Sequence, residues 1–212
     1  STRSLKQEIE HIAPGDADII IGPQLVAKGH NFPHLTLVGV IDTDIGLQGS
    51  DLRAAERTFQ LVRQVAGRAG RADKPGLALL QTHQPDHSVI RAILSGDEVG
   101  FWNAEAGARE VAAVPPFGRL AGIIISALDP EVAFDLGKHL ARQKAALERI
   151  GAQVYGPAPA PITRIRGRFR VRLLIKAAKR APLQKAISQW LRQVKLPNGI
   201  RLSVDIDPQT FL

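Results

Sequence analysis

The sequence predicts an α/β protein in two parts. An incomplete α/β lobe with a parallel sheet spans residues 1–114, and an α+β domain of order β-α-β-β-α-β spans residues 115–212. In the first part short apolar runs alternate with helix-like segments, as in parallel α/β sheets. Pro115-Pro116 interrupts helix formation between the parts. Finally, residues 1–112 hold 11 Lys/Arg against 14 Asp/Glu, whereas residues 113–212 hold 17 against 6.

Apolar runs define three strands of the first part: 18–22, 35–41 and 77–81. Helices are expected over 4–12, in the segment after residue 22, and over 52–66, 89–94 and 101–111. Apolar residues three and four apart give the helix over 52–66 one buried face, and Ser50 or Asp51 is its expected N-cap. The lobe is expected to be incomplete, with the chain beginning inside it.

The second part begins with a strand over 120–128. Asp129-Pro130 then caps a helix that runs to about Ile150 and is closed by Gly151. A short strand over 153–156, a proline-rich turn, and a strand over 169–176 follow. A helix from Pro182, whose apolar face includes Trp190, and a strand over 200–206 complete the order. This order is that of the split β-α-β, or ferredoxin-like, arrangement.

The composition excludes several kinds of site and segment. The chain has no cysteine, so disulfides and thiolate metal sites are excluded within it. No run of 18 apolar residues predicts a membrane span, and the N-terminus does not resemble a signal peptide. The basic second part predicts a polyanion partner. The alternative is a basic domain whose charge serves solubility alone.

The sharpest motif is Gln64-Val65-Ala66-Gly67-Arg68-Ala69-Gly70-Arg71, at the end of a predicted helix. Two arginines three residues apart lie on one side of a helical turn, and a guanidinium fork suits phosphate oxygens. The alternative is a solvated turn. The motif resembles motif VI of superfamily 2 helicases, in which Gln64, Arg68 and Arg71 would be the catalytic residues at the terminal phosphate of ATP.

A second motif, Gly22-Pro23-Gln24-Leu25-Val26-Ala27-Lys28-Gly29-His30-Asn31-Phe32-Pro33, resembles helicase motif V. Its residue pattern is similar to that of the primosomal replication-restart helicases, whose sequences continue with the patterns seen here at 35–38, 42–44 and 51–57. The resemblance covers nearly the whole chain. It implies nucleotide contacts by Gly22, Gln24, Gly67 and Gly70, and DNA contacts by Lys28, Gly29 and His30.

The sequence departs from that family at Pro23, where a threonine is usual. Proline lacks the hydroxyl and the backbone N–H, so any contact made through that threonine is in doubt. His30 has no second ligand at metal spacing, so a hydrogen-bonding role is expected and no metal site is predicted. Asp42 and Asp44, which follow a predicted strand, could hold magnesium, but a structural or interdomain role is preferred.

Arginines recur at every second position in the basic part. If the segment is extended, all five point to one face and would contact DNA phosphates. The alternative is an edge strand protected from aggregation by its charge. The five residues are Arg164, Arg166, Arg168, Arg170 and Arg172.

The family resemblance implies a RecA-like second motor lobe followed by a DNA-binding domain. The activity it implies is ATP-dependent 3′-5′ unwinding at stalled or branched forks, leading to replication restart in the bacterial cytoplasm. Implied partners are forked DNA, single-stranded DNA, primosome proteins, the single-stranded-DNA-binding protein and the replicative helicase loader. ATP and Mg²⁺ would be held largely by a first lobe, and zinc by a cysteine-rich insertion.

Neither of those family segments occurs in this sequence, and no phosphate-binding G-x-x-x-x-G-K-[ST] loop is present. The chain alone is therefore expected not to hydrolyse ATP. Two alternatives remain open. One is a non-catalytic nucleic-acid-binding module with a degenerate helicase lobe, which Pro23 favours. The other is a different superfamily 2 fork-remodelling helicase.

Overall fold

A computed structural model describes residues 17–22, 35–47, 51–67 and 76–210 of the chain. Internal contacts divide the chain into two compact units, Ser1–Phe101 (unit 1) and Trp102–Leu212 (unit 2). The division falls within helix α4 (Glu98–Val111). No helix in the described ranges is both long and apolar enough to cross a membrane.

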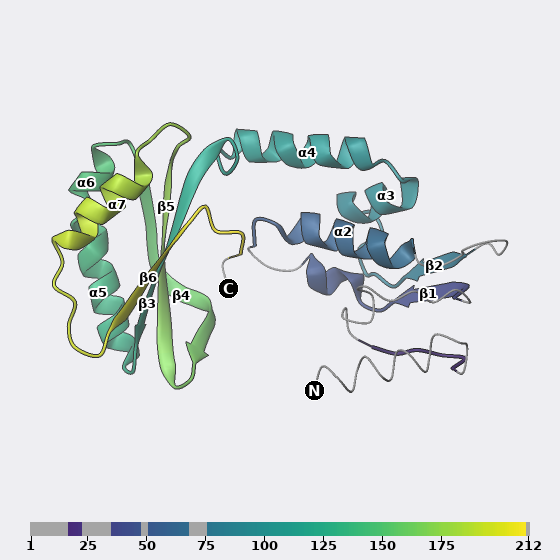
Figure 1. Cartoon of the computed structure of the whole chain (residues 1–212), viewed down its shortest axis with the longest axis horizontal. Helices are drawn as coiled ribbons and strands as arrows, with labels where there is room; N and C mark the ends of the chain where they lie inside the picture. The colour runs from purple at the N-terminus through teal and green to yellow at the C-terminus, as the bar shows by residue number, and fades with distance from the viewer. Residues whose placement is uncertain (1–16, 23–34, 48–50, 68–75, 211–212) are drawn as a thin grey trace. The chain divides into compact units, whose positions relative to one another are not determined.

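Unit 1 contains a two-stranded parallel sheet, as the sequence predicts. Strand β1 (Leu37–Val40) pairs with β2 (Leu77–Leu80). The 3-10 helix η1 (Thr43–Gly46) follows β1. Helices α2 (Ala54–Ala66) and α3 (Ser88–Ser95) lie on one side of the sheet (Figure 1). Phe59 and Val62 of α2 are buried, which confirms the predicted apolar face.

Two expectations for unit 1 are wrong. Residues 18–22 form no strand, and Ile19 and Ile21 are 80% and 93% exposed. A strand needs a hydrogen-bonded neighbour, and no strand among the described residues pairs with this run. Helix α2 has Arg53 at its N-cap with no side-chain cap. The Asp51 carboxylate instead accepts from the Arg53 backbone N–H at 3.1 Å, outside the helix.

Unit 2 is a four-stranded antiparallel sheet covered by helices on one face (Figure 1). The strands lie side by side in the order β4-β5-β3-β6. Apart from the short helix α6, the elements follow one another as the sequence predicts. They are β3 (Gly118–Ala127), α5 (Pro130–Arg142), α6 (Ala145–Glu148), β4 (Gln153–Ile165), β5 (Arg168–Ala178), α7 (Leu183–Arg192) and β6 (Arg201–Ile206).

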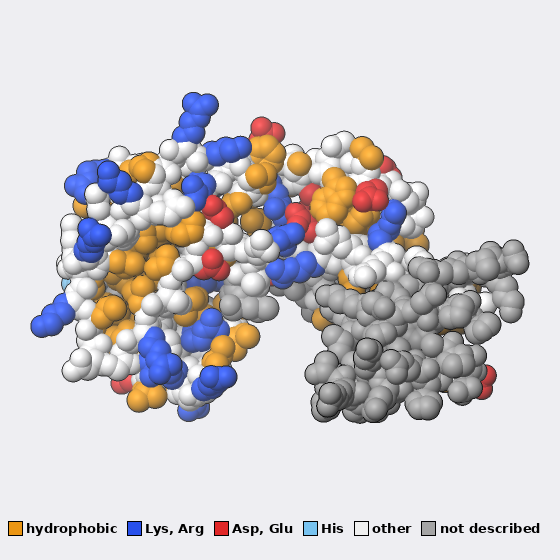
Figure 2. All heavy atoms as spheres, viewed as in Figure 1, with side chains coloured by type: hydrophobic (Ala, Val, Ile, Leu, Met, Phe, Trp, Pro, Cys, Tyr) orange, Lys and Arg blue, Asp and Glu red, His pale blue; other side chains and the backbone are white. Residues whose placement is uncertain are grey.

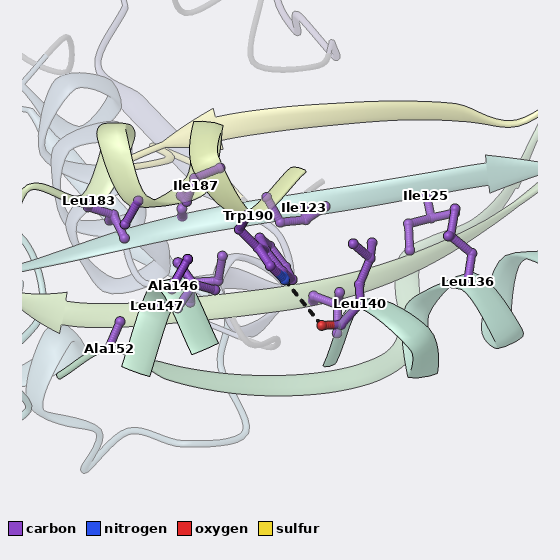
Figure 3. Close-up of a cluster of buried hydrophobic side chains, with 14 of the residues drawn as sticks. Ile123, Ile125, Leu136, Leu140, Ala146, Leu147, Ala152, Leu183, Ile187 and Trp190 are labelled. Carbon is purple, nitrogen blue, oxygen red and sulfur yellow. Dashed lines mark hydrogen bonds between the residues drawn. The ribbon is translucent and has the colours of Figure 1, made fainter. Parts of the chain in front are cut away.

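The core of unit 2 lies between the sheet and its helices. Alternate residues of β3 and β5 point into it, including Ile123, Ile125, Leu173 and Ile175, all of them fully buried. Trp190 of α7 is also fully buried, and its indole N–H donates to the Leu140 carbonyl at 3.2 Å (Figure 3). The prediction that Trp190 is a core residue is therefore confirmed.

Helix α5 begins as predicted and ends earlier than predicted. Asp129 accepts a hydrogen bond from the Glu131 N–H, and Pro130 lies in the first turn. The helix stops at Arg142, and α6 fills the remaining distance to Gly151, which has a φ of 69°. Glycine adopts this left-handed conformation without steric cost, so it suits the point where the chain leaves the helices.

Strand β4 is longer than predicted, because the expected proline-rich turn is part of it. The strand runs through Pro157, Pro159 and Pro161 to Ile165. Proline removes a ladder donor, so it is tolerated only at sheet edges and bulges. Strand β4 is an edge strand, and its pairing with β5 shifts register between Tyr155 and Ala158 and again between Pro159 and Arg164.

Candidate functional site

The predicted phosphate-facing motif begins at the end of α2. Gln64 is exposed on the last turn, and Gly67 is the C-cap residue, whose N–H donates to the Arg63 carbonyl at 2.9 Å. A Cβ added at Gly67 would approach that carbonyl to 3.2 Å. The motif thus starts where a helix ends, as predicted. Its remaining predicted site residues, Arg68, Gly70 and Arg71, lie outside the described residues.

An aromatic pair supports this end of α2. The Phe59 and Phe101 rings are stacked with centroids 4.0 Å apart. The Arg63 guanidinium lies 5.7 Å from the centroid of Phe59, and its Nη2 lies 3.3 Å from the Glu98 carboxylate. Arg63 therefore contacts the Phe59 ring of its own helix, α2, and the Glu98 carboxylate of α4. Its ion pair joins α2, the helix that carries the start of the motif, to α4.

The charged residues at the start of α2 pair with one another. The Arg53 side chain lies 2.8 Å from the Glu56 carboxylate, and Arg57 lies 2.7 Å from that of Asp51. The charges of this sequence pattern therefore shape the entry into α2. Such pairing organises the start of the helix.

The second predicted motif lies mostly outside the described residues. Gly22, the first residue of the motif, is exposed in an irregular segment. Pro23, and the predicted contacts Gln24, Lys28, Gly29 and His30, fall outside the described residues, so their roles remain predictions.

Asp44 joins the carboxyl ends of the two parallel strands. Its carboxylate accepts from the Thr82 hydroxyl at 2.5 Å and from the His83 backbone N–H at 2.6 Å. These two hydrogen bonds, that of Thr82 first, lower the pKa of Asp44 below its ordinary value of 3.8. The side chain is buried and committed to the fold. The described ranges also contain no group of three or more His, Asp or Glu that could hold a metal ion.

The five alternating arginines do not share one face, so that prediction is wrong. The chain reverses at Arg166-Gly167, with φ values of 50° and 78° that are typical of a type I′ hairpin turn. Arg164 pairs with Phe169 across the hairpin, and its guanidinium lies 5.0 Å from the centroid of that ring. Arg164 is therefore on the helix-covered face, Arg166 is in the turn, and the other three arginines are on the opposite face.

Arg168 is held by the fold. Its guanidinium donates to the Ser126 hydroxyl at 3.1 Å, to the Ser126 carbonyl at 2.8 Å, and to the Gly199 carbonyl. These bonds tie the turn end of the β4–β5 hairpin to the end of β3 and to the turn before β6. Five donors on a rigid plane suit such a position. Arg170 makes a weaker contact, with Nη1 3.4 Å from the Ile162 carbonyl.

Positive charge gathers at the turn between β4 and β5. Figure 2 shows blue Lys and Arg side chains over this lower end of unit 2. Arg164 and Arg166 are exposed there, and Ile162 and Ile165 beside them are 42% and 40% exposed. The hairpin end therefore presents guanidiniums and apolar side chains together to solvent.

The sheet face opposite the helices carries further candidate residues that sequence reasoning missed. Strand pairing brings Tyr155, Lys176 and Arg201 to the same face as Arg170 and Arg172. These residues lie on three strands, of which β4 and β5 form a hairpin and β6 lies beyond β3 in the sheet. Only the alternation within each strand could have signalled them, and that alternation does not say which strands are neighbours.

Comparisons with known proteins all point to one family. The family model described as "Primosomal protein N C-terminal domain" matches residues 110–209. A "Replication restart protein PriA" from Rickettsia typhi is 40% identical over 196 residues, which are 92% of this chain and 30% of the relative. Relatives with the same name from Rickettsia conorii and Haemophilus influenzae are each 38% identical. They cover 100% and 97% of this chain, which spans 32% and 28% of their lengths.

Proposed function

Since the chain belongs to the family of replication restart proteins PriA and corresponds to a C-terminal portion of them, we propose that it is part of an ATP-dependent 3′-5′ DNA helicase that acts at stalled or branched replication forks. The chain spans about a third of the length of these relatives. The proposed activity therefore belongs to a longer polypeptide. Its proposed partners are forked DNA, single-stranded DNA, primosome proteins, the single-stranded-DNA-binding protein and the helicase loader.

We propose that unit 1 is part of a RecA-like lobe. Arg68 and Arg71 would stabilise charge on the terminal phosphate of ATP, which the other lobe would bind together with Mg²⁺. Support comes from the position of Gln64 and Gly67 at the end of α2, because the two arginines follow directly. The parallel pairing of β1 and β2 also suits such a lobe.

The ATP proposal is tested in a chain extended by the segment that carries the phosphate-binding loop. Arg68→Ala and Arg71→Ala should each lower DNA-stimulated ATP hydrolysis at least a hundredfold and leave DNA binding unchanged. Arg63→Ala is the matched control, with a smaller loss expected because it acts through α2 alone. Full hydrolysis in both motif variants would contradict the proposal.

Unit 2 is proposed to be a ferredoxin-like DNA-binding domain. Its β-α-β-β-α-β order and its β4-β5-β3-β6 sheet support the fold. The observation that carries DNA binding is the exposed hairpin end with Arg164 and Arg166. Contacts to phosphates position a protein on DNA without reading bases, which suits recognition of fork structure.

DNA binding is tested by titrating the chain against a labelled duplex at several salt concentrations. Arg164→Ala/Arg166→Ala should weaken binding and reduce the slope of log K against log salt by about 0.9 for each phosphate that the variant no longer neutralises. Arg142→Ala/Arg149→Ala removes the same charge from the helix layer and should leave the slope unchanged. Equal effects of the two double variants would show that net charge alone drives binding, and would contradict a role for the hairpin end.

A further inference from the structure

The open face of the unit 2 sheet, defined as the face away from α5, α6 and α7, combines an aromatic ring with basic side chains. Core residues Ala121, Ile123 and Ile125 alternate along β3 with residues that point to the open face. Strand pairing then fixes one row across the four strands, because directly opposite residues share a face. The row is Tyr155, Leu174, Gly122 and Asp205.

Tyr155 is placed to stack. It lies on edge strand β4, and the residue is 49% exposed although it is large and aromatic. Its hydroxyl donates to Gln153 Oε1 at 2.6 Å, two residues away on the same face. This bond restrains the ring, and the exposed half of the residue can meet a planar ligand.

Gly122 leaves the row without a side chain near its centre, and the glycine itself is buried. It lies in central strand β3, between Leu174 of β5 and Asp205 of β6. A Cβ added at Gly122 would meet no atom within 4 Å. Glycine weakens a strand and is often found where a ligand approaches the backbone closely. Internal packing does not require glycine here, since the space above it could hold a side chain.

Basic residues flank the row on both sides. Arg172 and Lys176 each lie two positions from Leu174 along β5, about 7 Å away. Arg170 and Arg201 follow on the Arg172 side, across Ser126. Asp205 at the end of the row disfavours a phosphate there and can accept from a base amine. This arrangement suits a single nucleic-acid strand whose bases lie along the row and whose phosphates lie beside it.

We propose that this open face binds single-stranded DNA, with one base stacked on Tyr155, the next nucleotide over Gly122, and phosphates near Arg172 and Lys176. The inference rests on the proposed DNA-binding role of unit 2, and assigns it a second surface besides the hairpin end. A duplex keeps its bases stacked inside, so it cannot offer a base to Tyr155.

The test measures binding of the whole chain to labelled (dT)15 and to a 15-base-pair duplex. Gly122→Val fills the space above the glycine, and Tyr155→Ala removes the ring. Each should weaken (dT)15 binding about tenfold and change duplex binding less than twofold. Tyr155→Phe should keep most of the affinity, since stacking needs the ring alone. Gly39→Val is the matched control: Gly39 is a strand glycine in unit 1 whose added Cβ also meets nothing within 4 Å.

Thermal unfolding separates binding from folding. Gly122→Val should unfold at the same or a higher temperature, because valine favours strands over glycine. If the Gly122→Val variant folds poorly, the (dT)15 affinities of Tyr155→Ala and Tyr155→Phe are compared instead. Unchanged (dT)15 affinity in the Tyr155→Ala variant, or equal loss of duplex binding, overturns the open-face assignment. Failure of the unaltered chain to bind either DNA at low salt would overturn the proposed function as well.

Discussion

The Arg168 guanidinium donates to Ser126 and Gly199, so its removal should affect stability more than binding. Loss of hydrogen bonds from a charged, half-buried donor costs about 1–3 kcal/mol. We expect Arg168→Ala to lower the unfolding free energy of unit 2 by that amount, as measured by chemical denaturation. Arg168→Lys should rescue little, since an ammonium cannot reach three acceptors in one plane.

Arg166 provides the control for this prediction. It lies exposed in the hairpin turn. Arg166→Ala removes the same charge, and we expect a much smaller change in unfolding free energy. If Arg166→Ala and Arg168→Ala destabilise unit 2 equally, the fold does not depend on the hydrogen bonds of Arg168.

Asp44 is expected to titrate below ordinary aspartates, because the Thr82 hydroxyl and the His83 N–H bind its charged form. A depressed pKa in the folded state contributes stability above the unfolded value, and this contribution is lost as the pH falls through the folded pKa. Carbon-detected NMR titration should give Asp44 a pKa below 3.8, and Thr82→Val should raise it. A pKa at or above 3.8 in the unaltered chain would contradict the assigned bonds.

The turn between β4 and β5 is a place where one substitution should raise stability and lower DNA affinity. Arg166 has a φ of 50° in a type I′ turn, where Asn-Gly is favoured. We expect Arg166→Asn to stabilise unit 2 by about 0.5–1 kcal/mol, because asparagine tolerates left-handed backbone better than arginine. The same variant should weaken duplex binding by removing a cation. Thermal unfolding and DNA titration measure the two effects. Increased stability with unchanged DNA affinity would remove Arg166 from the proposed binding surface.

Local patterns in the sequence predict much of unit 2 and less of unit 1. The helix with Trp190 and the capped start of α5 depend on residues close together in the chain, so periodicity and capping locate them. The run over 18–22 has the composition of a buried strand, but composition does not supply a neighbouring strand. The prolines of β4 indicate a turn when read locally, because their tolerance in a strand depends on edge position, which is a property of the whole sheet.

The candidate site shows the same limit. Alternation predicts a single arginine face over 164–172 only if the extended chain continues without reversal. Arg166-Gly167 is a hairpin signal only weakly, since arginine is uncommon at positive φ. The Tyr155–Gly122 row could not be predicted at all, because it requires the register of three strand pairs.

For the whole molecule, the two units should differ in local stability. Unit 2 buries a continuous core between a four-stranded sheet and its helices, whereas the two-stranded sheet of unit 1 leaves Leu37, Leu77 and Leu79 more than half exposed. Amide exchange should therefore be slowest in β3 and β5 and clearly faster in β1 and β2. Equal protection across both units would show that they unfold together, against this expectation.

The most direct test of the account compares the affinity of the whole chain for a forked DNA and for a plain duplex of equal length over a range of salt concentrations. We expect tighter binding to the fork, because its single strands reach the open face while its duplex reaches the hairpin end. We also expect a steep salt dependence for both DNAs. Equal affinity for fork and duplex, or no binding at low salt, would contradict the proposal that unit 2 docks on replication forks.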